Sequence, residues 1–114
     1  MVILVCGSRE WTNRDSIAKA LSEFDPDETT VIHGDCRGAD RHGADIAARM
    51  GFAVRAYPAK WKELGRKAGV VRNQQMLDDG KPDLVLAFTL GTSGTADMIR
   101  RASIAGVMVR TYTN

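Results

Sequence analysis

Four short segments of this chain combine glycine with residue types that bind anionic ligands. The first, Gly7-Ser8-Arg9, places a hydroxyl and a guanidinium directly after an apolar run. A guanidinium can hold a phosphate through two parallel hydrogen bonds, and a glycine allows close approach of a ligand to the backbone. On its own this segment is equally typical of a tight turn with a solvated arginine, so its interpretation depends on the other three.

The second segment runs from His33 to Asp40 and leads directly into a predicted helix. The residues in it that we assign to a ligand site are Gly34, Asp35, Gly38, Ala39 and Asp40. Small residues here leave N–H groups free at the positive end of the helix dipole, which favours a phosphate or a ribose hydroxyl. Asp35 or Asp40 can instead cap the helix, and both readings can hold together. We interpret His33 as a satisfied strand-end residue.

The third segment, Gly65 to Met76, carries Arg72 and Asn73 in a helical pattern. Two glycines inside a helix cost roughly 1 kcal/mol each relative to alanine. We therefore expect a compensating feature such as close approach of a ligand to Gly65 or Gly69.

The fourth segment, Thr89 to Asp97, is again rich in glycine and opens another helix. Gly94 and Thr95 therefore form a second predicted phosphate cradle by the same dipole argument. No lysine follows Gly94, so this is not a Walker A loop, and the three-glycine dinucleotide pattern after the first strand is absent. These departures disfavour kinase and ordinary dehydrogenase chemistry.

Five apolar, β-branched-rich runs alternate with helical patterns and must position these segments. The predicted strands are Val2–Cys6, Thr30–His33, Ala53–Tyr57, Asp83–Phe88 and Val107–Tyr112. The runs are nearly continuous, as expected for strands covered on both faces. The alternation predicts an α/β fold: a single Rossmann-like three-layer domain over residues 1–114, with a five-stranded, mainly parallel sheet and helices on both faces. Parallel sheets of this kind bind ligands at the carboxyl ends of their strands.

Two of the predicted helices contribute directly to the candidate site. One spans about Trp61 to Asp78, and we expect its buried face to comprise Leu64, Ala68, Val71 and Gln75. The other spans about Thr95 to Ala105, with Met98, Ala102 and Ala105 on its buried face. The segment from Pro58 to Gly69 is the least regular part and a candidate flap.

Composition restricts the classes of function. The 114 residues include 16 basic and 14 acidic side chains, which are interspersed and give a net charge of +2, unlike the basic stripe of a nucleic-acid binder. No apolar run reaches the roughly 18 residues of a membrane span, so we expect a cytoplasmic protein without a membrane partner. Cys6 and Cys36 are interpreted as small apolar residues. We expect neither a cofactor nor a metal, since His33, Asp35 and Cys36 lack a recognised ligand spacing.

The motifs taken together resemble a known family. They are Gly7-Ser8-Arg9, His33-Gly34 through Gly38-Ala39-Asp40, Tyr57-Pro58 with Trp61, Gly65 through Ala68-Gly69, Arg72-Asn73 through Met76, and Gly94-Thr95. In this order they are similar to the YspA-like (DUF2493) branch of the SLOG superfamily, which also includes the lysine-decarboxylase-like LOG proteins. The resemblance implies a Rossmann-like fold and a pocket for nucleotides or ADP-ribose-like ligands.

The resemblance says less about catalysis. LOG enzymes split the N-glycosidic bond of cytokinin nucleotides with an arginine and with a glutamate that follows a glycine-threonine loop. Arg72 is similar to that arginine, whereas Met98 stands at the position of the glutamate. Asp97 is one residue away, and a shift of about 100° around a helix would direct it elsewhere.

Three hypotheses follow from the sequence. The first is a module that binds a nucleotide-derived small molecule, with phosphate held by Ser8, Arg9, the amides near Gly34, Gly38, Gly94 and Thr95, and by Arg72 with Asn73. The second is a nucleoside-monophosphate N-glycosidase in which Arg72 is catalytic and Asp35, Asp40 or Asp97 supplies the carboxylate. The third, which the charge distribution disfavours, is a nucleic-acid accessory domain that uses Trp11, Trp61, Lys60, Lys62, Arg66 and Lys67. A homo-oligomer is compatible with all three.

Overall fold

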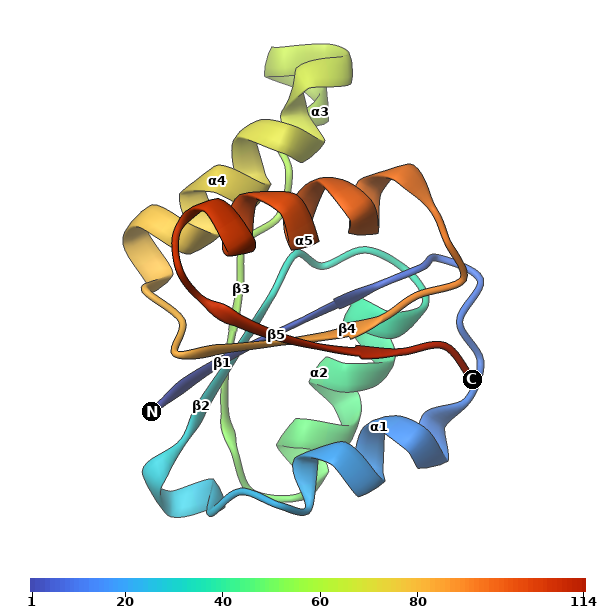
Figure 1. Cartoon of the computed structure of the whole chain (residues 1–114), viewed down its shortest axis with the longest axis vertical. Coiled ribbons are helices and arrows are strands. Elements are labelled where there is room, and N and C mark those ends of the chain that lie inside the picture. Colours follow the sequence, from blue (N-terminus) through green and yellow to red (C-terminus); the bar gives the residue numbers. More distant parts are fainter.

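The computed structural model describes all of residues 1–114 and contains one sheet of five parallel strands (Figure 1). The strands are β1 (Val2–Gly7), β2 (Thr30–His33), β3 (Ala53–Ala56), β4 (Leu84–Phe88) and β5 (Met108–Tyr112). Their order across the sheet is β3-β2-β1-β4-β5. The predicted Rossmann-like α/β fold is confirmed. Strand order reverses between β1 and β4, so the loops that follow these two strands border the crevice where such folds bind ligands.

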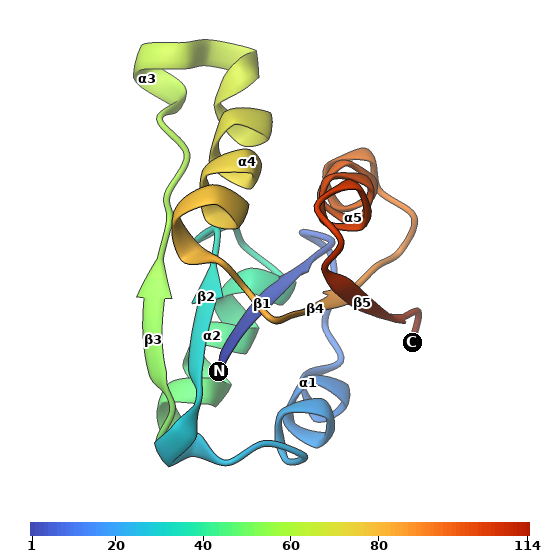
Figure 2. The ribbon, with the colours of Figure 1, turned by 60° about the vertical axis from the view of Figure 1, so that its left-hand side comes forward.

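Helices cover both faces of the sheet (Figure 2). Helices α1 (Arg14–Leu21) and α2 (Ala39–Arg49) lie on one face, and α4 (Ala68–Gly80) and α5 (Ser93–Ile104) lie on the other. Side chains of β1 alternate between the two faces of the sheet, as in any strand. Ile3 and Val5 belong to the core under α1 and α2, whereas Leu4 and Cys6 belong to the core under α4 and α5. A short 3₁₀ turn, Pro26–Glu28, links α1 to β2.

Coverage on both faces holds for the three inner strands and fails for the two edge strands. All five residues of β4 are buried, while β3 and β5 have no fully buried residue. An edge strand has only one neighbouring strand, and the helices here centre on β1, β2 and β4. The apolar character of the outer runs therefore does not reflect burial on two sides. None of the helices combines the length and apolar character needed to cross a bilayer.

The predicted single helix from Trp61 to Asp78 is wrong. The chain instead forms α3 (Trp61–Leu64), a 3₁₀ turn at Gly65–Lys67, and then α4. Gly65 has φ +59°, a left-handed conformation that interrupts the helix and that glycine adopts without strain. As a result α3 projects away from the sheet, above α4 (Figure 1).

The predicted buried face of this stretch is also wrong. Leu64, Val71 and Gln75 are exposed. The residues of α4 that face the protein are Ala68, Arg72, Asn73, Met76, Leu77 and Gly80. The spacing of apolar residues predicted the wrong face of the helix because two polar side chains, Arg72 and Asn73, lie on the inner face, where each has hydrogen-bond partners within the protein. Ala105 is likewise exposed, since it lies beyond the end of α5.

A candidate ligand-binding cavity at the carboxyl edge of the sheet

A cavity of about 590 Å³ opens between the ends of β1 and β4 and the helices α4 and α5. It brings together predicted site residues from all four loop segments: Gly7, Arg9, Asp40, Arg72, Asn73, Gly94 and Thr95. Five other predicted site residues do not line it: Ser8, Gly34, Asp35, Gly38 and Ala39. The four segments therefore converge as predicted, but only part of each one reaches the cavity.

The first turn of α5 offers unpaired amide donors to this cavity. The backbone N–H groups of Ser93, Gly94 and Thr95 have no acceptor inside the protein, as is usual for the first turn of a helix. Thr92 occupies the N-cap position without capping any of them. A Cβ built on Gly94 would meet nothing within 4 Å, so the space beside this turn is open. The arrangement suits an anion at the positive end of the helix dipole.

Ser8 has a structural role instead of the predicted contact with phosphate. Ser8 is 1% exposed, and its Oγ accepts a hydrogen bond from the Leu90 amide at 2.8 Å. The same oxygen bonds the Thr92 hydroxyl at 2.9 Å, and Thr92 in turn bonds Thr95 at 3.2 Å. The Ser8 hydroxyl therefore joins the loop after β1 to the loop after β4 and occupies the hydroxyl that would otherwise cap α5.

The loop after β2 uses two of the amide donors of the predicted phosphate cradle within the protein. The Gly34 amide donates to Asp40 Oδ2 at 2.9 Å, and the Ala39 amide donates to the Ser8 carbonyl at 3.2 Å. Gly38 has φ +80°, and a Cβ there would lie 2.3 Å from the Arg9 carbonyl oxygen, so close packing of the two loops requires glycine. Gly38 is the N-cap residue of α2 and no side chain caps this helix, so neither Asp35 nor Asp40 has the predicted capping role; Asp40 instead holds the Gly34 amide of the preceding loop.

Two aspartates of this loop differ in environment. Asp35 is exposed and pairs with Arg41 at 3.4 Å, away from the cavity. Asp40 is 5% exposed and lines the cavity. Burial raises the pKa of Asp40 to about 6, although nearby Arg72 and the amide bond from Gly34 act in the opposite direction. Asp40 is therefore the one buried carboxyl that borders the cavity.

Arg72 is buried and held in place by the loop after β2. Its Nε donates to Asn73 Oδ1 at 3.1 Å, and its Nη1 donates to the carbonyl of Gly34. Its Nη2 lies 3.6 Å from Cys36 Sγ. A buried guanidinium with these neutral partners, at the wall of a cavity, keeps its positive charge available to an anionic ligand.

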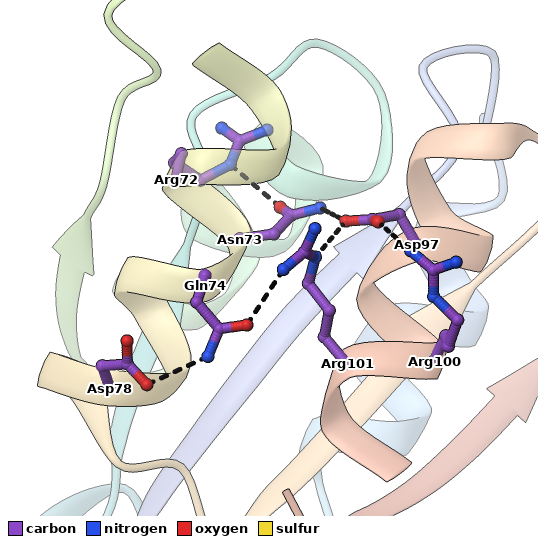
Figure 3. A network of polar contacts seen from close by, with 7 residues as sticks. All are labelled: Arg72, Asn73, Gln74, Asp78, Asp97, Arg100 and Arg101. Carbon is purple, nitrogen blue, oxygen red and sulfur yellow. Dashed lines mark hydrogen bonds and ion pairs between the residues drawn. The ribbon is translucent and has the colours of Figure 1, made fainter. Parts of the chain in front are cut away.

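Asn73 connects this arginine to a network between α4 and α5 (Figure 3). Its Nδ2 donates to Asp97 Oδ2 at 3.0 Å, and Arg101 Nε donates to the same oxygen at 2.8 Å. Asp97 Oδ1 accepts from Arg100 at 2.9 Å. Burial alone would raise the pKa of Asp97, but the bonds from Asn73 and Arg101 outweigh it and hold that pKa below its usual range.

Asp97 consequently faces α4 and does not line the cavity, as the helical offset from the family glutamate predicts. Met98, 1% exposed, contributes an apolar side chain to the cavity where LOG enzymes have that glutamate. Cys6 lies in the same wall, and burial, followed by the nearby Asp40, raises the pKa of its thiol far above the ordinary range. Cys6 and Met98 therefore form an apolar part of the cavity wall.

The rim of the cavity is cationic. Four arginines line the cavity against two carboxylates, Glu10 and Asp40. Arg37 pairs with Glu10 at 2.6 Å, while the side chains of Arg9 and Arg66 have no hydrogen-bond or ion-pair partner. The positive charges around the cavity outnumber the negative ones, which favours the binding of an anionic ligand.

Several lining residues were not predicted from the sequence. Cys6 was interpreted as a small apolar residue, Met98 as part of a buried helix face, and Met76 was named only as part of the family motif. Thr92 and Ser93 precede the glycine that was singled out. A helix-start signal, a threonine followed by a small residue, marks these last two. Gly69 was expected to approach a ligand because of the cost of glycine in a helix, and it does line the cavity, whereas Glu10, Arg37 and Val70 carried no signal of their own. Trp61 and Arg66 had been assigned to nucleic acid only.

Three further predictions concern His33, Trp11 and the two cysteines. His33 Nδ1 accepts the Asp35 amide at 3.0 Å, and burial lowers its pKa, in agreement with a satisfied strand-end residue. Trp11 is 2% exposed and packs on Phe88, so its predicted stacking on nucleic acid is wrong. Both cysteines are free.

The fold and the cavity define the class of protein: a Rossmann-like α/β protein with a cavity at the switch point between β1 and β4. Comparison with known families then identifies it more closely. The profile of the YspA, cpYpsA-related SLOG family matches residues 1–64, more than half of the chain. The gene 61 protein of Mycobacterium phage D29 is 38% identical over 120 residues, which cover 94% of this chain and 92% of that protein. The chain belongs to this SLOG family, and membership suggests a nucleotide-related ligand.

Proposed function

We propose that this protein binds a phosphate-bearing, nucleotide-derived small molecule in the cavity described above. The observation that carries the proposal is the open start of α5, where Ser93, Gly94 and Thr95 line the cavity and their amides have no internal acceptor. Helix starts of this kind bind phosphate through amide donors and the helix dipole. In this proposal residues 1–114 act as one ligand-binding domain.

The cations around the cavity support a ligand with negative charge. Arg72 is fixed at the buried end by Gly34 and Asn73, so its position costs little additional ordering when a ligand binds. Arg9 and Arg66 lie at the exposed rim without ion-pair partners. The volume, about 590 Å³, falls within the roughly 300–1,000 Å³ of small-molecule sites and exceeds what phosphate alone requires.

Native mass spectrometry of the protein as purified from cells tests this function directly. A retained nucleotide-derived mass, released intact on denaturation, is the expected result. Titration calorimetry against nucleoside monophosphates, NAD, ADP-ribose and cyclic ADP-ribose isomers complements it. Failure of every compound to bind, together with an empty protein, would refute the proposal.

A second candidate, cleavage of a nucleotide N-glycosidic bond, is favoured by one observation. Asp40 is a buried carboxyl that borders the cavity together with Arg72, the arginine similar to that of LOG enzymes. In this candidate Arg72 orients the phosphate and Asp40 stabilises the positive charge that develops on the ribose. Incubation with nucleoside monophosphates should release free base from the wild type and not from the Asp40→Asn variant. Nucleotide that stays intact with the wild type would eliminate the candidate.

A further inference from the structure

Trp61 is an aromatic side chain for which the fold has little structural use. It is 47% exposed and lines the cavity from α3, and no residue from Trp61 to Lys67 is buried. One edge of its ring rests on α4, where a Cβ built on Gly69 would lie 3.3 Å from it. Trp11, in contrast, is 2% exposed and donates its indole N–H to the Asn13 carbonyl at 3.0 Å. Trp61 is therefore the aromatic surface that the protein leaves exposed at the cavity.

The partner of this ring is an unanchored guanidinium. Arg9 Cζ lies 5.8 Å from the centroid of the Trp61 ring, within the range of a cation–π contact. Direct contact between two planar groups requires only about 3.5–4 Å. The distance between the Arg9 guanidinium and the Trp61 ring is therefore larger than that of two groups in direct contact. A third planar group between the two would need roughly 7 Å, about 1 Å more than the observed distance. Because Arg9 is exposed and has no hydrogen-bond partner, it can move by that distance freely.

We propose that the ligand carries a planar base that inserts between the Trp61 indole ring and the Arg9 guanidinium. This inference rests on the proposed function, since it identifies the second chemical group of the ligand held in the same cavity. The face of a guanidinium stacks on aromatic rings while its N–H groups point outward in the plane, so Arg9 can contact a base and still donate to phosphate.

The experiment compares two probes, a nucleoside 5′-monophosphate and ribose 5-phosphate, which differ only in the base. Calorimetric titrations are made with the wild type and with the variants Trp61→Ala and Trp61→Phe, using all four common bases. Leu64→Ala is the matched control, since Leu64 is an exposed apolar residue of the same helix that does not line the cavity. Quenching of tryptophan fluorescence gives a second measurement, because Trp61 is exposed and Trp11 is buried.

Stacking of one base on an aromatic ring predicts that Trp61→Ala weakens nucleotide binding about 5- to 150-fold. The same variant should leave ribose 5-phosphate binding unchanged, Trp61→Phe should retain most of the affinity, and Leu64→Ala should match the wild type. The nucleotide, but not ribose 5-phosphate, should quench the wild-type fluorescence.

Equal nucleotide affinity of the wild type and Trp61→Ala, with ribose 5-phosphate still bound, would refute the stacking and leave the proposed function intact. Absence of binding by either probe to the wild type would refute both. An equal loss of both probes in Trp61→Ala would also refute the stacking, because it would show that the ring supports the shape of the cavity instead of the base.

Discussion

Replacement of Ser93 by proline removes one proposed phosphate donor while it keeps the helix. Ser93 is the first residue of α5, a position that proline favours because its missing N–H has no intrahelical acceptor. The preceding Thr92 has φ −80° and ψ 152°, the extended conformation that a residue before proline requires. The substitution should therefore leave the free energy of unfolding unchanged or raise it by about 0.4–1 kcal/mol.

Ligand affinity should fall in the same variant. A charge-assisted hydrogen bond contributes about 1.5–3 kcal/mol, so loss of the Ser93 amide should weaken binding of a nucleoside monophosphate about 10- to 150-fold. Calorimetry measures the affinity, and urea denaturation measures the stability. Ser93→Ala keeps the amide, removes only the hydroxyl and serves as the control. A folded Ser93→Pro variant that binds as tightly as the wild type would refute the assignment of phosphate to the start of α5.

Three further predictions follow from the contacts of single residues. Arg72→Lys should lower the free energy of unfolding by about 1–3 kcal/mol and reduce nucleotide affinity by about tenfold or more. The reason is that lysine lacks the two separate guanidinium donors that bond Asn73 and Gly34 at the same time. Unchanged affinity by calorimetry and unchanged stability by urea titration would contradict this prediction. The raised pKa of Asp40, about 6 against an ordinary 3.8, implies stability that is present below about pH 4 and lost as the pH rises through 6, about 3 kcal/mol in total. Asp40→Asn should lack that loss, so wild type and variant should differ in the change of unfolding free energy between pH 4 and pH 7, and parallel profiles would be inconsistent with a buried carboxyl. Asp97→Asn should cost about 1–2 kcal/mol of stability at pH 7 and leave nucleotide affinity within about twofold, since Asp97 bonds Asn73 of α4 and does not line the cavity. Because the pKa of Asp97 is lowered, its contribution to stability is lost as the pH falls, so the difference in unfolding free energy between wild type and variant should narrow in acid. A large loss of nucleotide affinity in the variant would place Asp97 in the site instead.

The arrangement of the sheet followed from the sequence because it depends on few local choices. The apolar runs and the lengths of the crossovers leave a parallel sheet with helices on both faces as the main solution. The convergence of Arg9 and Gly94 also followed, since the carboxyl ends of all parallel strands lie at one edge, and Arg72 reaches the same edge from the first half of α4.

The distribution of hydrogen bonds within that edge could not be predicted in this way. Glycine and small residues near Gly38 suggest free amides, but only the packing of two loops shows that Asp40 and Ser8 accept from this loop. The inner face of α4 was missed for a related reason. Arg72 and Asn73 are buried because Gly34 and Asp97, distant in sequence, satisfy them.

An amide NMR titration of the labelled protein with a nucleoside 5′-monophosphate tests the central claim most directly. The amides of Ser93, Gly94 and Thr95 should show the largest changes in chemical shift, and the Trp61 indole N–H should shift with them. A second, separate hollow is lined by residues such as Val71, Gln75 and Asp79, and changes confined to it would contradict a phosphate site at the start of α5.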